Sequence, residues 1–206
     1  MVVDDFRCPG PAPVTRIRWW GSHKAWVAPE PPELQPSAWH IGFWANAAEG
    51  LQPDELYPER LVWAVEVPPE RVNLEVAGLN EFPDRPSETC YLYDLDLEPG
   101  EWFDHSRFSS NEDVFWIGIT AIYPPDVDQV NMWNWTTRPG VWGRGAAMPA
   151  IMGEWPDYEE RLFPGRINPV ESDQLCGENL SYDLCFELLS EHSWSMWDQS
   201  FVGLRE

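Results

Sequence analysis

The chain has 206 residues, of which 35 are acidic and 13 are basic, so its formal net charge is -22. This charge repels the phosphates of nucleic acids and anionic membrane surfaces, so we expect neither as a partner. Hydrophobic residues make up 43% of the chain and 21 residues are proline, which favours a folded core without long helices.

Short runs of β-branched and aromatic residues, separated by Pro, Gly and Asp turns, predict strands along almost the whole chain. The expected strands are residues 2–7, 14–20, 37–46, 61–67, 72–76, 90–97, 114–123, 130–137 and 181–189. Only residues 53–57 and 156–161 hint at helix, and the proline-rich residues 28–36 are expected to be a surface loop. This pattern predicts an all-β fold: one antiparallel, jelly-roll-like β-sandwich over residues 1–190.

Alternation within the strands predicts which side chains share a face. In residues 14–20, Ile17 and Trp19 share one face, and Arg18 and Trp20 share the other. In residues 37–46 the apolar side carries Trp39, Ile41 and Phe43, so His40 is expected to face solvent.

Four cysteines form an even set, which indicates disulfides in an extracellular setting. Cys176 and Cys185 flank a turn, so a local bridge between them is expected, with Cys8 and Cys90 as the second pair. Four free thiols are the first alternative. Zinc is the least favoured, because the chain has no C-x-x-C motif.

Catalytic motifs are sparse, and we expect the protein not to be an enzyme. The chain has no G-x-S-x-G elbow, no P-loop and no H-E-x-x-H motif. A glycan-active hydrolase would need two facing carboxyl groups. The candidates for these carboxyl groups are acids that lie among aromatic residues in the sequence, namely Glu66, Glu101, Asp104 and Glu154.

No cofactor is expected to be required, but a structural calcium ion would suit the many acids. Calcium takes several oxygen ligands, and acids two residues apart on a strand point to the same side. The candidate ligands are Asp4, Asp5, Asp94, Asp96, Asp126 and Asp128.

Fourteen tryptophans, several in close pairs, are the strongest compositional signal. Most are expected to fill the core, where indole rings bury a large apolar area. An exposed tryptophan can instead stack on a sugar or anchor a protein interface. The candidates for sugar stacking are Trp20, Trp44, Trp133 and Trp142.

The last segment, residues 191–206, is an aromatic tail beyond the expected sandwich. As an extended strand it would present Trp194 and Met196 on one face, and Trp197 and Phe201 on the other. A strand that is apolar on both faces favours burial, either in its own sheet or as an added strand in a neighbouring copy. We therefore expect these four residues to form an intersubunit contact.

Several motifs together resemble an uncharacterised family of secreted bacterial β-sandwich domains. They are the opening Asp4-Asp5-Phe6-x-Cys8, the strand Ile17-x-Trp19-Trp20-Gly21-Ser22, and the final strand from Ser181 to Leu188. The resemblance implies secretion and a sandwich fold, and it carries no catalytic residues. The first residues lack the features of a signal peptide, and no run is long and apolar enough to span a membrane.

The leading functional hypothesis is therefore a non-catalytic, self-associating structural subunit of an extracellular fibre, sheath or surface assembly. A carbohydrate-binding module that uses exposed tryptophans is the alternative, with surface glycans as partners. A glycan-active hydrolase is the distant third.

Overall fold

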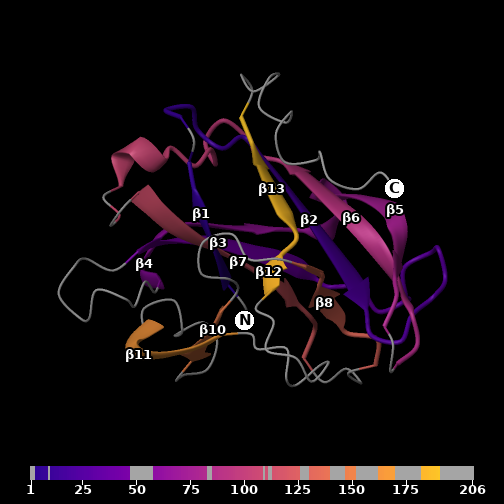
Figure 1. Cartoon of the computed structure of the whole chain (residues 1–206). Helices are drawn as coiled ribbons and strands as arrows, with labels where there is room; N and C mark the ends of the chain where they lie inside the picture. The colour runs from indigo at the N-terminus through magenta and orange to yellow at the C-terminus, as the bar shows by residue number, and fades with distance from the viewer. Residues whose placement is uncertain are drawn as a thin grey trace, which may run out of the picture.

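The computed structural model describes residues 3–8, 10–46, 58–82, 85–108, 110, 113–125, 130–139, 147–151, 162–169 and 182–190. These residues form two main antiparallel sheets, which pack face to face (Figure 1). One sheet contains β1 (Val3–Arg7), β3 (Ala38–Asn46), β4 (Pro58–Val67), β7 (Val114–Ile122), β10 (Ala147–Ile151) and β11 (Leu162–Pro169). Its six strands lie in the order β11-β10-β1-β7-β3-β4.

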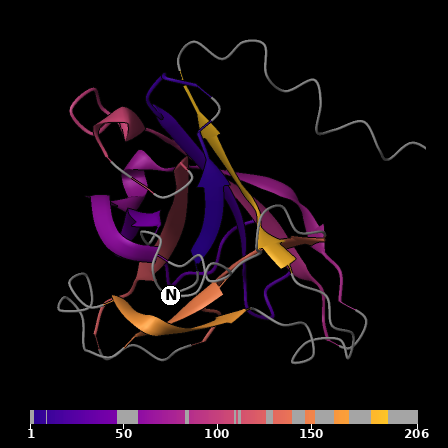
Figure 2. The ribbon, with the colours of Figure 1, turned by 60° about the vertical axis from the view of Figure 1, so that its left-hand side comes forward.

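The second main sheet has five strands. They are β2 (Arg16–His23), β5 (Asn73–Asn80), β6 (Glu88–Asp96), β8 (Trp133–Trp135) and β13 (Phe186–Leu189). Four of them lie in the order β13-β2-β6-β5, and β8 pairs with the end of β2. A small ribbon is formed by β9 (Thr137–Pro139) and β12 (Tyr182–Leu184), while η1 (Pro69–Arg71) and η2 (His105–Arg107) are short 3-10 turns. Figure 2 shows the orange β10–β11 hairpin running below the other strands.

The predicted all-β sandwich is confirmed, and the predicted strands recur with shifted ends. The sequence did not predict β10 or β11, whose residues lack a clear alternation. The predicted strand over residues 181–189 is broken at Cys185, because the residues before it pair with β9 and the residues after it pair with β2. Two segments were expected to be weakly helical, residues 53–57 and 156–161, and both lie outside the described residues. The proposed domain boundary at residue 190 coincides with the last described residue.

An aromatic core fills the space between the sheets. Trp39 from β3 lies against Trp19 of β2, Tyr93 of β6 and Trp133 of β8, with ring centroids 5.5, 5.0 and 5.0 Å apart. Alternation explains this arrangement, because Ile17 and Trp19 lie on the same face of β2, and the structure turns that face inward. Aromatic pairs in such tilted geometries add to the stabilisation that burial itself gives.

The other face of the six-stranded sheet is also buried, and this corrects the prediction for His40. His40 was expected to face solvent, but it is only 4% exposed. The neighbouring Trp44 is fully buried, and its ring lies over Gly42 and Gly118, which are paired across β3 and β7. The sheet therefore carries apolar side chains on both faces, although a single alternating strand suggests only one buried face.

Within the part of the chain that the structure describes, no helix is long and apolar enough to cross a membrane.

His23 is the last residue of β2, and it is fully buried. Its Nδ1 is 3.0 Å from the carbonyl oxygen of Asn131, so this nitrogen donates. Its Nε2, 3.3 Å from the hydroxyl of Tyr93, is then left to accept a hydrogen bond. Burial lowers the pKa of His23, although the Asn131 carbonyl and the charge of Glu88 oppose this. His23 is therefore neutral in the folded protein at neutral pH.

This burial predicts loss of stability in mild acid. Below pH 6.5 the unfolded chain binds a proton at His23 that the folded chain does not, so the stability present above pH 6.5 declines as the pH falls toward the lowered pKa. The loss is at most about 1.4 kcal/mol per pH unit in this window. Urea unfolding at pH 7.5 and 5.5 should show a smaller pH effect in His23→Gln than in the wild type. An unchanged pH effect in His23→Gln would contradict the assignment.

Candidate functional site

The outer face of the five-stranded sheet carries most of the polar chemistry. Alternation along β2 places Arg16, Arg18 and Trp20 on this face. The register sets Arg18 opposite Asp94 of β6 and Glu187 of β13, and it sets Trp20 opposite Leu92. We call this surface the polar face.

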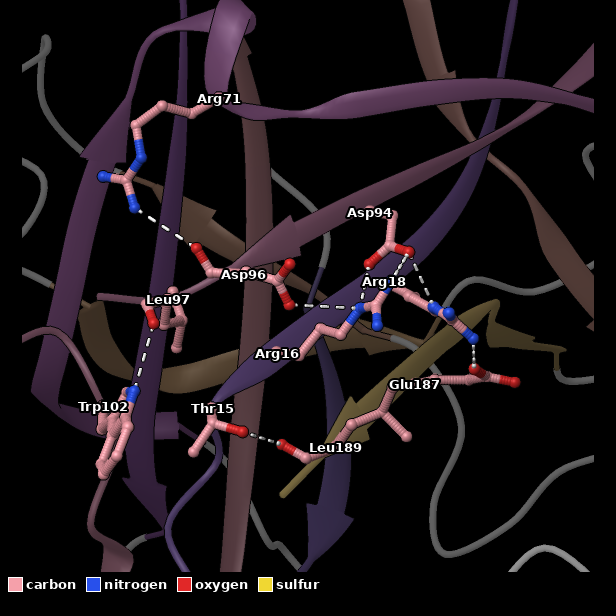
Figure 3. A network of polar contacts seen from close by, with 10 residues as sticks. All are labelled: Thr15, Arg16, Arg18, Arg71, Asp94, Asp96, Leu97, Trp102, Glu187 and Leu189. Atoms are coloured by element: carbon pink, nitrogen blue, oxygen red, sulfur yellow. Dashed lines mark hydrogen bonds and ion pairs between the residues drawn. The ribbon is translucent and has the colours of Figure 1, made fainter. Parts of the chain in front are cut away.

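Ion pairs link three neighbouring strands across the polar face (Figure 3). Asp94 accepts hydrogen bonds from Arg16 Nε (2.6 Å) and Arg18 Nε (3.1 Å), and Arg16 Nη2 also contacts its second oxygen. Arg18 Nη1 reaches Glu187 on β13 (3.6 Å), and Arg16 Nε lies 3.4 Å from Asp96. The network ties the last described strand to the middle of the sheet.

The pKa values of the two buried carboxyl groups move in opposite directions. Burial raises the pKa of Asp94, but the hydrogen bond from Arg16 and the charge of Arg18 outweigh it, so the pKa is lowered overall. For Glu187 burial is the stronger influence, and its pKa is raised even though Arg18 opposes the shift. Asp94 is thus a firmly ionised anchor for both arginines.

This network corrects the calcium prediction at Asp94, because arginine side chains engage both of its oxygens. Asp96 has one oxygen 3.4 Å from Arg16 and is exposed, so calcium binding there stays a prediction. Asp4 and Asp5 are neighbours on β1, so they point to opposite faces and do not share a site. Asp4 is 1% exposed and accepts hydrogen bonds from the amides of Asp5 (3.0 Å) and Leu184 (2.7 Å).

The remaining calcium candidates, Asp126 and Asp128, lie outside the described residues. Among the described residues, no three His, Cys, Asp or Glu side chains are grouped as a metal site would require.

The four tryptophans proposed for sugar stacking do not form an exposed row. Trp44 is 0% exposed, so the prediction for it is wrong. Trp133 is half-buried and packs at 5.0 Å against Trp39, as part of the core margin. Trp142 lies outside the described residues, and only Trp20 lies on an open sheet face, where it is half-buried.

The expected bridge between Cys8 and Cys90 is absent, since both are free thiols. Cys8 follows β1 in the six-stranded sheet, whereas Cys90 lies on β6 with its sulfur 3.8 Å from Thr136 Oγ1. Sequence could not show that the two belong to different sheets. Burial, with a smaller contribution from Asp113, raises the pKa of the Cys8 thiol to about 12. The expected partner of Cys185, Cys176, lies outside the described residues.

The carboxylates nominated for hydrolysis have structural partners instead. Glu101 forms a two-pronged pair with Arg71 (2.8 and 2.7 Å), which is the main reason that its pKa is lowered. Asp104 caps η2 through the amide and hydroxyl of Ser106, and its pKa is lowered too. A general acid needs a raised pKa, so neither fits that role. Glu66 is exposed, and Glu154 lies outside the described residues.

The free edge of β5 is a second candidate site, and the sequence did not single it out. β5 pairs with β6 on one side, and no described strand pairs with its other side. Val76 and Leu79 on this strand are 53% and 59% exposed. The strand has a bulge between Val76 and Gly78, and Gly78 adopts a φ of 151° that disfavours other residues.

One side-chain hydrogen bond ties the loop before β3 to the strand next to β5. Tyr91, the partner of Val76 on β6, donates its hydroxyl hydrogen to the carbonyl of Ala28 (2.7 Å). The exposed apolar residues of the β5 edge itself are Val76 and Leu79. Apolar residues in a short predicted strand were the only sequence signal for this edge.

Comparison with known proteins identifies the family of the chain. A family model described as a domain of unknown function (DUF7901) matches residues 1–189, so the chain belongs to this family. No curated protein and no solved structure matches the chain.

Proposed function

We propose that this member of the DUF7901 family is a non-catalytic, secreted structural subunit that self-associates into an extracellular fibre, sheath or surface assembly. The observation that carries the proposal is the outer edge of β5, with which no described strand pairs, together with the exposed Val76 and Leu79. An open edge of this kind is a template for an added strand. The occupant we assign to it is the aromatic tail, residues 191–206, of a second copy.

The alternation of apolar residues in the tail sequence fits a strand added at this edge. A strand added to β5 presents alternate side chains to the two faces of the sheet. One apolar set, Trp194 and Met196 or Trp197 and Phe201, would then lie beside Val76 and Leu79. The other set would lie on the opposite face of the added strand.

The geometry of such a contact is head-to-tail, because the tail and β5 are different surfaces of the subunit. Contacts of this type propagate into open filaments unless a rotation closes a ring. A net charge of -22 repels neighbouring subunits, so assembly should strengthen with ionic strength as this repulsion is screened. The same charge would keep filaments from aggregating side by side.

The prediction is that the tail and the β5 edge are both required for assembly. Light scattering and electron microscopy of the intact chain at about 0.15 M salt, where charges farther apart than about 8 Å are screened, should show particles larger than a monomer. Deletion of residues 191–206, or the pair Val76→Lys and Leu79→Lys, should reduce the particles to monomers. Val130→Lys is the matched control, because Val130 is 62% exposed but lies outside β5.

Mixing the two defective proteins separates strand addition from general destabilisation. The tail-deleted protein keeps its β5 edge and the β5 variant keeps its tail, so their mixture should give a dimer that does not extend. A monomeric intact chain, or particles whose size is unchanged by tail deletion, would refute the proposal.

A further inference from the structure

A short strip of the polar face has the features of a separate ligand site. Trp20 of β2, Leu92 of β6 and Glu75 of β5 lie side by side in one cross-strand row. The next row contains Arg18, Asp94 and Asn73. We propose that these two rows bind a neutral oligosaccharide, with the apolar face of one pyranose ring stacked on the indole of Trp20.

Trp20 is held rigidly by its backbone at a change of strand partner. Its amide donates to the carbonyl of Cys185 (3.1 Å), and its carbonyl accepts from the amide of Thr136 (2.9 Å). On the other side Trp20 is paired with Leu92. A ring presented on a fixed backbone loses little freedom when a ligand stacks on it.

The indole of Trp20 is open to solvent, unlike those in the core. The residue is half-buried, and its N–H has no hydrogen-bond partner in the described chain. In contrast, Trp63 and Trp102 donate to the carbonyls of Glu101 (2.8 Å) and Leu97 (3.1 Å). Trp20 therefore offers both an apolar ring and a free donor at the surface.

The second row supplies fixed polar groups for sugar hydroxyls. Arg18 is held between Asp94 (3.1 Å) and Glu187 (3.6 Å), so its guanidinium is oriented before any ligand arrives (Figure 3). Guanidinium nitrogens not used by these carboxylates can donate to a pair of hydroxyl oxygens. Asn73 and Glu75 are exposed at the β5 end of the same rows and add an amide and an acceptor.

Space for the ligand exists beside these rows. Gly78 follows Glu75 on β5 and lies opposite Cys90, and a Cβ placed on it would meet no atom within 4 Å. Gly78 lies next to the β-bulge of β5 and itself adds no side chain to this end of the strip.

Charge on the polar face selects a neutral ligand. Four carboxylates surround only two guanidiniums here, namely Glu75, Asp94, Asp96 and Glu187 against Arg16 and Arg18. Uronic acids, sulfated sugars and phosphates would be repelled by this excess and by the net charge of -22. Uncharged hydroxyls satisfy both the carboxylates and the arginine donors.

Affinity electrophoresis with soluble polysaccharides tests the proposal. The probes are the neutral xyloglucan, mixed-linkage β-glucan and galactomannan, with anionic alginate and polygalacturonate as the contrast. Migration of the wild type should be retarded in a gel that contains at least one of the neutral polysaccharides. Trp20→Ala should weaken this retardation by tenfold or more. Trp20→Phe keeps a ring and should retain part of the binding, while Val130→Lys should bind as the wild type does.

The result is independent of the self-association proposal when the tail-deleted protein is used, because that protein keeps the polar face. No retardation by any neutral probe, retardation by anionic probes alone, or full binding by Trp20→Ala would overturn the inference. A far-ultraviolet circular dichroism spectrum of Trp20→Ala that matches that of the wild type confirms that any loss of binding is not caused by misfolding.

Discussion

Replacing Trp39 with alanine is expected to destabilise the protein by about 3–5 kcal/mol, the range for large aromatic residues removed from a core. Trp39 is 2% exposed and comes from the six-stranded sheet. Its ring contacts Trp19, Tyr93 and Trp133, all of which belong to the other sheet. The substitution therefore removes one aromatic contact between the two layers and leaves a cavity at their interface.

Urea unfolding, followed by tryptophan fluorescence and circular dichroism, measures this effect. Trp20→Ala is the matched control, because Trp20 is half-buried on the outer face of the sheet. Its loss should change the free energy of unfolding by less than about 1 kcal/mol, as is usual away from the core. A Trp39→Ala protein as stable as this control would show that the sheets are not joined through Trp39.

Gly21→Ala is expected to destabilise the protein by about 1–3 kcal/mol, the usual effect of overpacking. A Cβ at Gly21 would lie 2.0 Å from Nε1 and 2.6 Å from Cε2 of Trp133, and 3.0 Å from the carbonyl oxygen of Asn134. Trp133 cannot move away freely, because its ring packs against Trp39. The added methyl group must therefore displace β8 or disturb the aromatic core.

Gly100→Ala is the control for this substitution, since a Cβ at Gly100 would meet no atom within 4 Å. It should leave the urea midpoint close to that of the wild type. Near-ultraviolet circular dichroism should also change in Gly21→Ala, because the environment of Trp133 changes. Equal stability of the two variants would mean that the contact between Gly21 and Trp133 is relaxed at little cost.

Particular strands show how far the sequence alone could reach. Alternation in β2 and β3 correctly grouped Ile17 with Trp19, and Trp39 with Ile41 and Phe43, and the structure buries both groups in the core. The same rule was wrong for His40, because it assumes that one face of each strand meets water. Whether a second face is covered depends on segments far away along the chain, and a local pattern does not contain that information.

In the candidate sites too, the sequence predicted which neighbouring residues share a face but not which distant residues they contact. Arg18 and Trp20 could be assigned to one face from their spacing, but their partners Asp94, Glu187 and Leu92 come from strands 72 to 169 positions away. Likewise, the pairing rule for cysteines could not show that Cys8 and Cys90 lie on different sheets. Contacts between distant segments depend on strand order and register, which only the folded structure shows.

The length, the proline content and the net charge of -22 were enough to predict an acidic protein without long helices that repels nucleic acids. These are sums over residues, and they do not depend on how the chain folds. The tertiary structure decided where the charges and the aromatic rings lie. It put Trp44 in the interior and Trp20 on a face of paired ions, and it left one edge of β5 without a partner among the described strands. Burial and pairing are properties of neighbours in space, so residues of the same type took on different physical roles.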